Sequence, residues 1–215
     1  MKKTAVIVDY GVGNLRSVAR AVVACGWDPV LAVDASGVDK AERIILPGVG
    51  AFASCVEALT AHGLKAPVMR AMDDGRPILG ICVGMQMLLD KSEEFGDHAG
   101  LGRIAGRVAA IPRGGADGTP HKIPHIGWSP LQPAGAGWAD TIFEGVEPGS
   151  ACYFVHSFSA MPERADVKLA VCDYNGVEIC AALRSGNLYG VQFHPEKSGP
   201  VGLKIIANFL SMPKA

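Results

Sequence analysis

One cysteine of this chain stands in a setting suited to nucleophilic catalysis. Residues 80–84 read GICVG, after an apolar run at 76–79 and before the apolar residues 87–89. This order predicts a strand, a tight turn and a helix, with Cys82 at the turn. The flanking glycines avoid the crowding that a Cβ would cause there. At a helix N-terminus the backbone dipole favours the thiolate, so we expect an exposed nucleophile for acyl transfer.

A histidine and a glutamate supply the groups that such a nucleophile needs. His194 and Glu196 are two residues apart, so an extended backbone would place both side chains on one side. The carboxylate could then accept one imidazole N–H, which leaves the other ring nitrogen to take a proton from the thiol. Both this pair and Cys82 follow predicted strands, and sites in α/β sheets gather beyond the carboxyl ends of strands.

A glycine-rich turn offers donors for an oxyanion. Residues 46–50 read LPGVG and also lie between a predicted strand and a helix. Glycines there let backbone N–H groups approach a developing negative charge, and the N–H of Val83 would be a second donor. Taken alone, the turn is better interpreted as an ordinary glycine-rich turn.

Three further segments have a functional and a structural interpretation. Residues 9–16 (DYGVGNLR) begin like a dinucleotide fingerprint, but Arg16 occupies the third glycine position, which favours a turn or an interaction loop. On the strand-like segment 153–158, His156 is interpreted as a core or surface residue, whereas Ser157 and the adjacent backbone could bind a polar substrate. Trp128 lies beside glycine and proline in an expected loop, where contact with a partner protein is a reasonable interpretation.

Composition excludes several classes of protein. The chain has 215 residues with 49% hydrophobic and 19% charged residues, which predicts one ordered domain over residues 1–215. A net charge of -1 gives no reason to expect nucleic acid or a membrane as partner. The six cysteines form no CxxC pair and no metal-ligand spacing. We therefore expect no metal, no cofactor and a cytoplasmic location.

The hydrophobic pattern predicts repeated β-α units in the first half and short strands in the second. Strands are expected at residues 4–9, 29–33, 43–46, 77–81, 103–111, 150–159, 167–174, 177–184 and 188–193. Helices are expected at 14–25, 51–62, 66–74 and 199–210, the last with Ser198 as its N-cap. Asn175-Gly176 predicts a hairpin turn. The expected fold is α/β: a three-layer α/β/α sandwich around a mixed, mostly parallel sheet with an antiparallel extension.

These motifs together resemble the class I (triad-type) glutamine amidotransferases. The GICVGMQ elbow and the distant HPE at 194–196 are typical of the whole family, and the resemblance covers nearly the whole chain. Three stretches narrow it to the HisH branch, the glutaminase subunits of imidazole glycerol phosphate synthase: residues 9–14 (DYGVGN), 124–128 (PHIGW) and 194–199 (HPEKSG).

The resemblance implies hydrolysis of L-glutamine to glutamate and ammonia through a cysteinyl thioester. In this scheme Cys82 attacks, His194 transfers protons and Glu196 orients the imidazole. The backbone N–H groups of Val49 and Val83 would bind the oxyanion. The residues expected to line the glutamine site are Gly48, Gly50, Gln86, His156, Ser157 and Phe158.

The resemblance also implies a partner. HisH-like proteins pass ammonia to a separate (β/α)₈ cyclase, HisF, which makes imidazole glycerol phosphate and AICAR in histidine biosynthesis. This chain is too short to hold a barrel of ~250 residues as well. We expect the interface near Asn14, Arg16, Trp128 and Lys197. Relatives often carry Asn and Tyr where this chain has Ser129 and Phe158, so a polar group is lost at each position.

Other functions share part of this pattern. Glutaminase subunits of vitamin B6 or anthranilate synthesis have the same triad, and only the motifs outside the triad separate them from the HisH branch. A γ-glutamyl hydrolase or a cysteine peptidase would use the same nucleophile in another reaction. A binding module with a structural Cys82 is the non-enzymatic alternative, and it would keep its function after Cys82→Ala.

Overall fold

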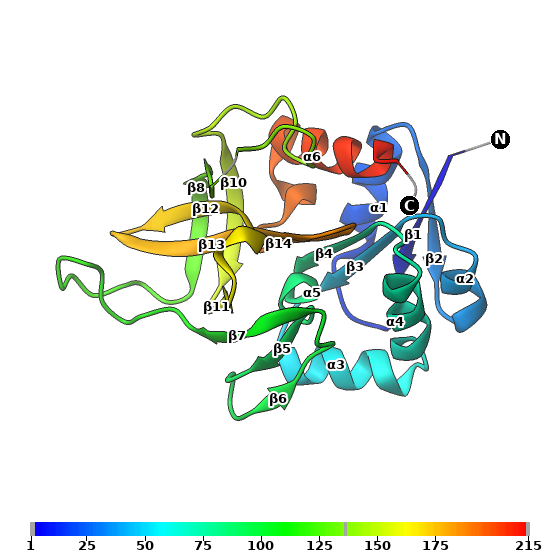
Figure 1. The fold of residues 1–215 in the computed structure, drawn as a ribbon, viewed down its shortest axis with the longest axis horizontal. Coiled ribbons are helices and arrows are strands. Elements are labelled where there is room, and N and C mark those ends of the chain that lie inside the picture. Colours follow the sequence, from blue (N-terminus) through cyan, green and yellow to red (C-terminus); the bar gives the residue numbers. More distant parts are fainter. Residues whose placement is uncertain (1–2, 136, 214–215) are drawn as a thin grey trace.

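A mixed eight-stranded sheet forms the centre of the protein (Figure 1). The structure is a computed structural model, and it describes residues 3–135 and 137–213. The strands in spatial order are β2 (Asp28–Ala32), β1 (Thr4–Val8), β3 (Ile44–Gly48), β4 (Ile78–Cys82), β14 (Leu188–Val191), β13 (Val177–Ser185), β12 (Lys168–Tyr174) and β9 (Gln132–Pro133).

The sheet has a parallel part and an antiparallel part. Neighbouring strands from β2 to β14 are parallel, whereas β13, β12 and β9 continue the sheet in antiparallel pairs. Strands β3 and β4 are buried along their whole length, as continuous apolar runs between two helical layers should be. The mixed, mostly parallel sheet and its antiparallel extension are therefore confirmed.

Helices cover both faces of the parallel part. Helices α1 and α6 pack together on one face, and α3 and α4 pack on the other (Figure 1). The helices are α1 (Leu15–Ala24), α2 (Ala35–Asp39), α3 (Phe52–Ala61), α4 (Lys65–Asp73), α5 (Val83–Gln86) and α6 (Gly199–Ser211), with 3₁₀ turns η1 (Ala165–Val167) and η2 (Pro195–Lys197). The short α2 was not predicted from the sequence. Within the described residues, no helix is long and apolar enough to span a membrane.

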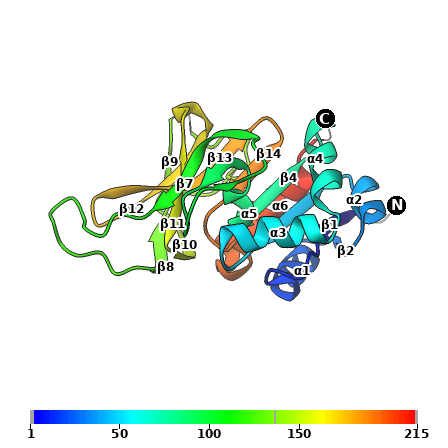
Figure 2. The ribbon, with the colours of Figure 1, turned by 90° about the horizontal axis from the view of Figure 1, so that it is seen from below.

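Two smaller sheets stand beside the antiparallel part (Figure 2). One pairs β10 (Ala151–His156) with β8 (His125–Pro130). The other has the order β11 (Phe158–Pro162), β7 (Ile104–Ala110), β5 (Leu89–Ser92) and β6 (His98–Ala99). The predicted single strand over 150–159 is wrong, because the chain changes sheets at Ser157, whose carbonyl accepts the N–H of Ile111 at 2.9 Å.

Three other local predictions need correction. The segment around Trp128 is part of strand β8 rather than a loop. The helix after Cys82 is only the four-residue α5, because the buried Leu88 and Leu89 continue into β5. Ser198 stands before α6, but its hydroxyl makes no capping bond; it donates to the carbonyl of His194 and accepts the N–H of Tyr153. The hairpin at Asn175-Gly176 is confirmed, with positive φ at both residues.

Candidate active site

Cys82 lies on a strained turn at the end of β4. Its φ is 55°, a region that non-glycine residues rarely adopt. The turn presses directly on the neighbouring strand: a Cβ added to Gly84 would lie 1.9 Å from the carbonyl oxygen of Leu46. A Cβ on Gly80 would lie 2.6 Å from the carbonyl oxygen of Gly84. The two glycines therefore permit a close approach that fixes the direction of the cysteine side chain.

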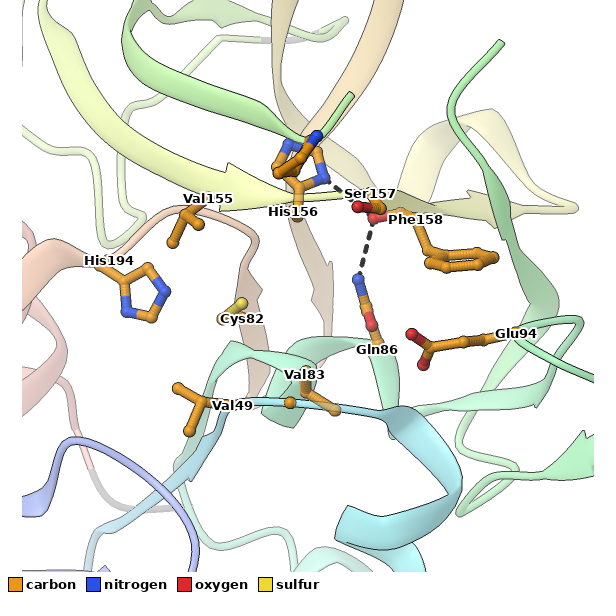
Figure 3. A pocket seen from close by; sticks show the side chains of 12 residues that line it. Val49, Cys82, Val83, Gln86, Glu94, Val155, His156, Ser157, Phe158 and His194 are labelled. Carbon is orange, nitrogen blue, oxygen red and sulfur yellow. Dashed lines mark hydrogen bonds between the residues drawn. The ribbon is translucent and has the colours of Figure 1, made fainter. Parts of the chain in front are cut away.

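The sulfur of Cys82 borders a cavity of about 310 Å³ (Figure 3). Cys82 itself is only 5% exposed, so the expected exposed elbow is in fact recessed. The cavity is lined by Val49, Gly50, Cys82, Val83, Gln86, Glu94, Pro124, Val155, His156, Ser157, Phe158 and His194. A recessed sulfur at the wall of a cavity this small suits a small polar substrate that buries most of its surface inside the protein.

His194 enters this cavity with Glu196 behind it. Nδ1 of His194 lies 2.9 Å from Oε1 of Glu196, and both side chains are almost completely buried. The predicted pairing is correct, but the reason differs: β14 ends at Val191, and Glu196 belongs to the 3₁₀ turn η2, which folds its carboxylate back onto the ring. Because Nδ1 is bonded to Glu196, Nε2 is the nitrogen of His194 that can exchange a proton with Cys82 and the substrate.

The charge of His194 is set by its two neighbours. Burial alone would lower the pKa of the imidazole, but hydrogen bonds and charge attraction from Cys82 and Glu196 outweigh burial and raise it from 6.5 to about 9. At neutral pH the ring is therefore held as an imidazolium beside the sulfur and the carboxylate. A protonated His194 beside the sulfur can give its proton to the leaving group without first taking one from another donor.

The backbone groups expected at the oxyanion site lie beside the sulfur. Val49, Gly50 and Val83 line the cavity, and the carbonyl of Val49 accepts the thiol of Cys55 at 3.4 Å. Gly48 does not line the cavity. Instead it packs against the elbow, where a Cβ would lie 2.7 Å from the N atom of Gly84.

The remaining residues predicted for the glutamine site form the opposite wall (Figure 3). Nε2 of Gln86 donates to the carbonyl of Phe158 at 3.0 Å, and Nδ1 of His156 donates to the same oxygen at 2.9 Å. Ser157 lies between His156 and Phe158 in the sequence, where β10 ends and β11 begins. The sheet change that the sequence did not predict therefore builds this wall.

Sequence reasoning missed four residues of the site. Glu94, Pro124 and Val155 line the cavity, and Glu94 also accepts the first N–H of α3 from Phe52 at 2.6 Å. The fourth is Gln192, whose Nε2 lies 3.7 Å from Sγ of Cys82. Its position two residues before His194 is the same spacing that drew attention to Glu196, and this was the signal that could have found it.

Ser129 keeps a polar role. Its hydroxyl lies 2.8 Å from Nε2 of His125, and Nδ1 of His125 lies 3.0 Å from Nε2 of His156. The expected loss of a polar group at this position is therefore wrong, because the serine hydroxyl makes a buried hydrogen bond. At Phe158 it is the backbone carbonyl that makes the polar contacts.

The residues expected at a partner interface lie near one another on three elements. Trp128 on β8 is 57% exposed and meets the ring of Tyr153 at 6.0 Å. The exposed Lys197 places its ammonium 5.9 Å from the same ring. Helix α1, which begins after Asn14 and carries the exposed Arg16, packs against η2. In the part of the chain that the structure describes, no group of three or more His, Cys, Asp or Glu side chains could hold a metal ion.

Solved structures share this fold. The chain matches the Thermotoga maritima PurLQS structure with a TM-score of 0.71 at 24% identity, covering 98% of both chains. The glutaminase domain of Trypanosoma brucei CTPS matches with a TM-score of 0.63 at 15% identity, covering 99% of this chain and 95% of that one. At these identities the similarity supports the fold alone.

Sequence relatives carry the assignment further. Residues 6–212 match the model of the family described as glutamine amidotransferase class-I. The chain is 49% identical over 208 residues to imidazole glycerol phosphate synthase subunit HisH 1 of Legionella pneumophila, covering 96% of this chain and 98% of that protein. It is 47% identical to the HisH subunit of Geobacter sulfurreducens, covering 96% and 97%. The resemblance found in the motifs is confirmed, and the chain belongs to the HisH family of class I glutamine amidotransferases.

Proposed function

We propose that this chain hydrolyses L-glutamine and supplies the ammonia to a (β/α)₈ cyclase, as the glutaminase subunit of an imidazole glycerol phosphate synthase. One observation carries the proposal: the recessed Cys82 sulfur shares a cavity with the His194 ring, and Glu196 holds that ring in place. The names of relatives that are 45–49% identical favour this branch over glutaminases of vitamin B6 or anthranilate synthesis.

The first half of the reaction forms a thioester. The Cys82 thiolate attacks the side-chain amide carbon, and a C–S bond forms while the carbonyl oxygen becomes an oxyanion. Donors for that oxygen are the N–H groups of Val83 and, when its peptide faces the cavity, Val49. The oxyanion collapses, His194 gives its proton to the amide nitrogen, the C–N bond breaks and ammonia leaves.

The second half releases glutamate. His194, now neutral, takes a proton from water, and the resulting hydroxide attacks the thioester carbon. The C–S bond breaks and the electron pair returns to the Cys82 sulfur. Throughout both halves Glu196 keeps the imidazole oriented and balances its positive charge.

The far end of the cavity fits the amino-acid part of glutamine. Glu94 brings a carboxylate to the wall, which suits the α-ammonium group of the substrate (Figure 3). The Gln86 amide nitrogen is occupied by Phe158 and Gln192, so its Oε1 is the group left for substrate. Ser157 supplies a hydroxyl on the same wall.

We place the cyclase on the face that carries Trp128, Lys197, Arg16 and Asn14. A large exposed aromatic ring next to a cation is typical of interface residues, and the exposed Ile126 extends the apolar part of β8. The relatives are named as subunits, which supports a heterodimer. The cytoplasm is the proposed compartment, and the six free thiols suit a reducing environment.

The test is glutamine turnover by the chain alone and with a HisF-type cyclase and its nucleotide substrate. We expect slow turnover alone and an increase of about tenfold or more with the partner. Cys82→Ala should abolish turnover, whereas Cys25→Ala, which changes a half-buried thiol outside the cavity, should retain it. Equal turnover with and without the cyclase would contradict the partner, and turnover by Cys82→Ala would contradict the nucleophile.

The interface has its own test. Trp128→Ala should weaken binding of the cyclase and reduce the stimulated turnover, because an exposed aromatic side chain that the cyclase would bury is lost. Leu31→Ala removes a comparably exposed apolar side chain from β2, the edge strand of the eight-stranded sheet, and serves as the control. Unchanged cyclase affinity in Trp128→Ala would move the interface elsewhere.

A further inference from the structure

We propose that Gln192 is a further catalytic residue, which donates a hydrogen bond to the Cys82 sulfur and thereby favours its thiolate form. The inference extends the proposed function, since it concerns the same nucleophile. Gln192 directly follows β14, is fully buried, and directs Nε2 toward Sγ of Cys82 at 3.7 Å. Its side chain meets the sulfur within the buried core rather than at the open end of the cavity.

The orientation of the Gln192 amide follows from its neighbours. The carbonyl of Phe158 can only accept, so Gln86 must present its NH₂ group there. The same NH₂ group reaches Oε1 of Gln192 at 2.9 Å. Gln192 therefore uses its oxygen to accept from Gln86, and its own NH₂ group faces the sulfur. An NH₂ group can donate to a thiolate but cannot accept the proton of a thiol.

A chain of neutral groups holds this arrangement in place. The carbonyl of Phe158 accepts Nδ1–H of His156, which leaves Nε2 of His156 to accept Nδ1–H of His125. Nε2 of His125 then accepts the hydroxyl of Ser129. Burial lowers the pKa of both histidines to about 4, so both rings are neutral at neutral pH. The direction of every bond in the chain is thus fixed, and the chain ends at the sulfur.

The other ionisable groups around Cys82 do not replace this donor. Tyr10 and Cys55 interact electrostatically with Cys82, but the Tyr10 hydroxyl donates to the carbonyl of Pro47 and the Cys55 thiol to the carbonyl of Val49. Burial raises the pKa of Tyr10 and raises that of Cys55 to about 11, so both are neutral. His194 supplies the positive charge, but its proton moves to the leaving group during the reaction. Gln192 remains a donor throughout the cycle.

A hydrogen-bond donor to the sulfur would increase the rates of both half-reactions. Sulfur is charged before attack and again when the C–S bond breaks during thioester hydrolysis, whereas in the thioester it is neutral and a weak acceptor. A donor to sulfur therefore stabilises the thiolate both as nucleophile and as leaving group. Removing it should lower the rate of steps at sulfur more than the affinity for glutamine.

The experiment measures alkylation of Cys82 by iodoacetamide at neutral pH, followed by mass of the Cys82 peptide, without glutamine or partner. Gln192→Leu should slow alkylation by about tenfold or more. Gln192→Glu, which keeps the shape but places an oxygen against the sulfur, should slow it at least as much. In the complex, kcat should fall similarly while KM changes by less than about twofold. Gln132→Leu, at an exposed position on β9, is the matched control.

The two variants and the two assays separate the possible failures. Wild-type alkylation rates in a folded Gln192→Leu or Gln192→Glu variant would overturn the inference, and if Gln192→Leu fails to fold, the Glu variant decides. If the wild-type complex hydrolyses no glutamine while alkylation still depends on Gln192, the proposed function fails and the donor role stands. If wild-type turnover is normal and the variants match it, the donor role fails alone.

Discussion

His194 and His156 both line the cavity, and His125 is bonded to His156, yet these buried rings carry different charges at neutral pH. The pKa of His194 is raised to about 9, because Cys82 and Glu196 outweigh the effect of burial. Burial, with a smaller contribution from the charge of His121, lowers the pKa of His125 to about 4. Burial likewise lowers the pKa of His156, which is hydrogen-bonded to His125, to about 4. We call the first pair, His194–Glu196, the charged pair and the second, His125–His156, the neutral pair.

The difference shows that the partner of a buried imidazole decides its charge. In the charged pair, His194 lies between the carboxylate of Glu196 and the sulfur of Cys82, so the positive charge of the protonated ring is compensated. In the neutral pair, His125 and His156 are bonded to each other, to the hydroxyl of Ser129 and to the carbonyl of Phe158. These groups can direct hydrogen bonds but cannot balance a charge. The buried imidazole beside the reacting sulfur is therefore charged, whereas the two imidazoles of the neutral pair are held by hydrogen bonds between neutral groups.

Removing the imidazole of the charged pair should have the largest effect. His194→Asn takes away the proton donor and acceptor of both half-reactions, so glutamine turnover in the complex should fall by about a thousandfold or more. The assay is ammonia release with the cyclase bound. His62→Asn, at the exposed end of α3, should behave as wild type. More than a tenth of wild-type turnover in His194→Asn would contradict its role.

Neutralising the carboxylate should have a smaller effect on rate and a distinct effect on pH dependence. Glu196→Gln should reduce turnover by a factor that is roughly tenfold or more smaller than the loss in His194→Asn, because the proton donor and acceptor itself remains. In the wild type, activity should decline as pH rises through about 9, where the imidazolium is lost. Without the anion, one cause of the raised pKa of His194 disappears, so the decline should begin at lower pH. Glu57→Gln, at an exposed position, is the control and should keep the wild-type pH profile. If Glu196→Gln lost activity at the same alkaline pH as the wild type, this coupling would be excluded.

The two pairs should give opposite slopes of stability with pH. His194 has a raised folded pKa, so its contribution is complete below 6.5 and is lost as pH rises toward about 9. The neutral pair has lowered folded pKa values, so its contribution is complete above 6.5 and is lost as pH falls toward about 4. Tm measured across this range should fall on both sides of about pH 6.5. A His125→Phe variant with an acid limb as steep as that of the wild type would contradict the assignment.

Removing the hydroxyl that donates to the neutral pair should have the smallest effect. Ser129→Ala leaves Nε2 of His125 buried without its donor, which should cost about 1–3 kcal/mol of folding free energy. For a chain of this size that is a fall in Tm of about 2–4 °C per kcal/mol. Ser54→Ala, at an exposed position on α3, should change Tm little. An equal Tm for the two variants would mean that the hydroxyl does not support His125.

The charged pair could be predicted from sequence because it depends on local signals. Cys82 lies between glycines at the end of an apolar run, and Glu196 is two residues from His194, so neighbouring residues already define both motifs. The alternating β-α pattern of the first half likewise predicts the parallel sheet, because each apolar run is long enough to be recognised alone.

The neutral wall could not be predicted because it depends on pairing between distant segments. The chain changes sheets at Ser157 because β10 pairs with β8 whereas β11 pairs with β7. His125 and Gln192 acquire their roles through partners 31 and 110 residues away. The helix after the elbow was predicted too long, because the apolar residues Leu88 and Leu89 fit a strand as well as a helix.

The most direct test of the two pairs is a titration of the imidazole nitrogens by ¹⁵N NMR, with His194→Asn and His125→Phe used to assign the signals. We predict that His194 remains doubly protonated up to about pH 9, whereas His125 and His156 keep a single ring proton down to about pH 4. A neutral His194 at pH 7, or a protonated His125 at pH 6, would contradict these charge states.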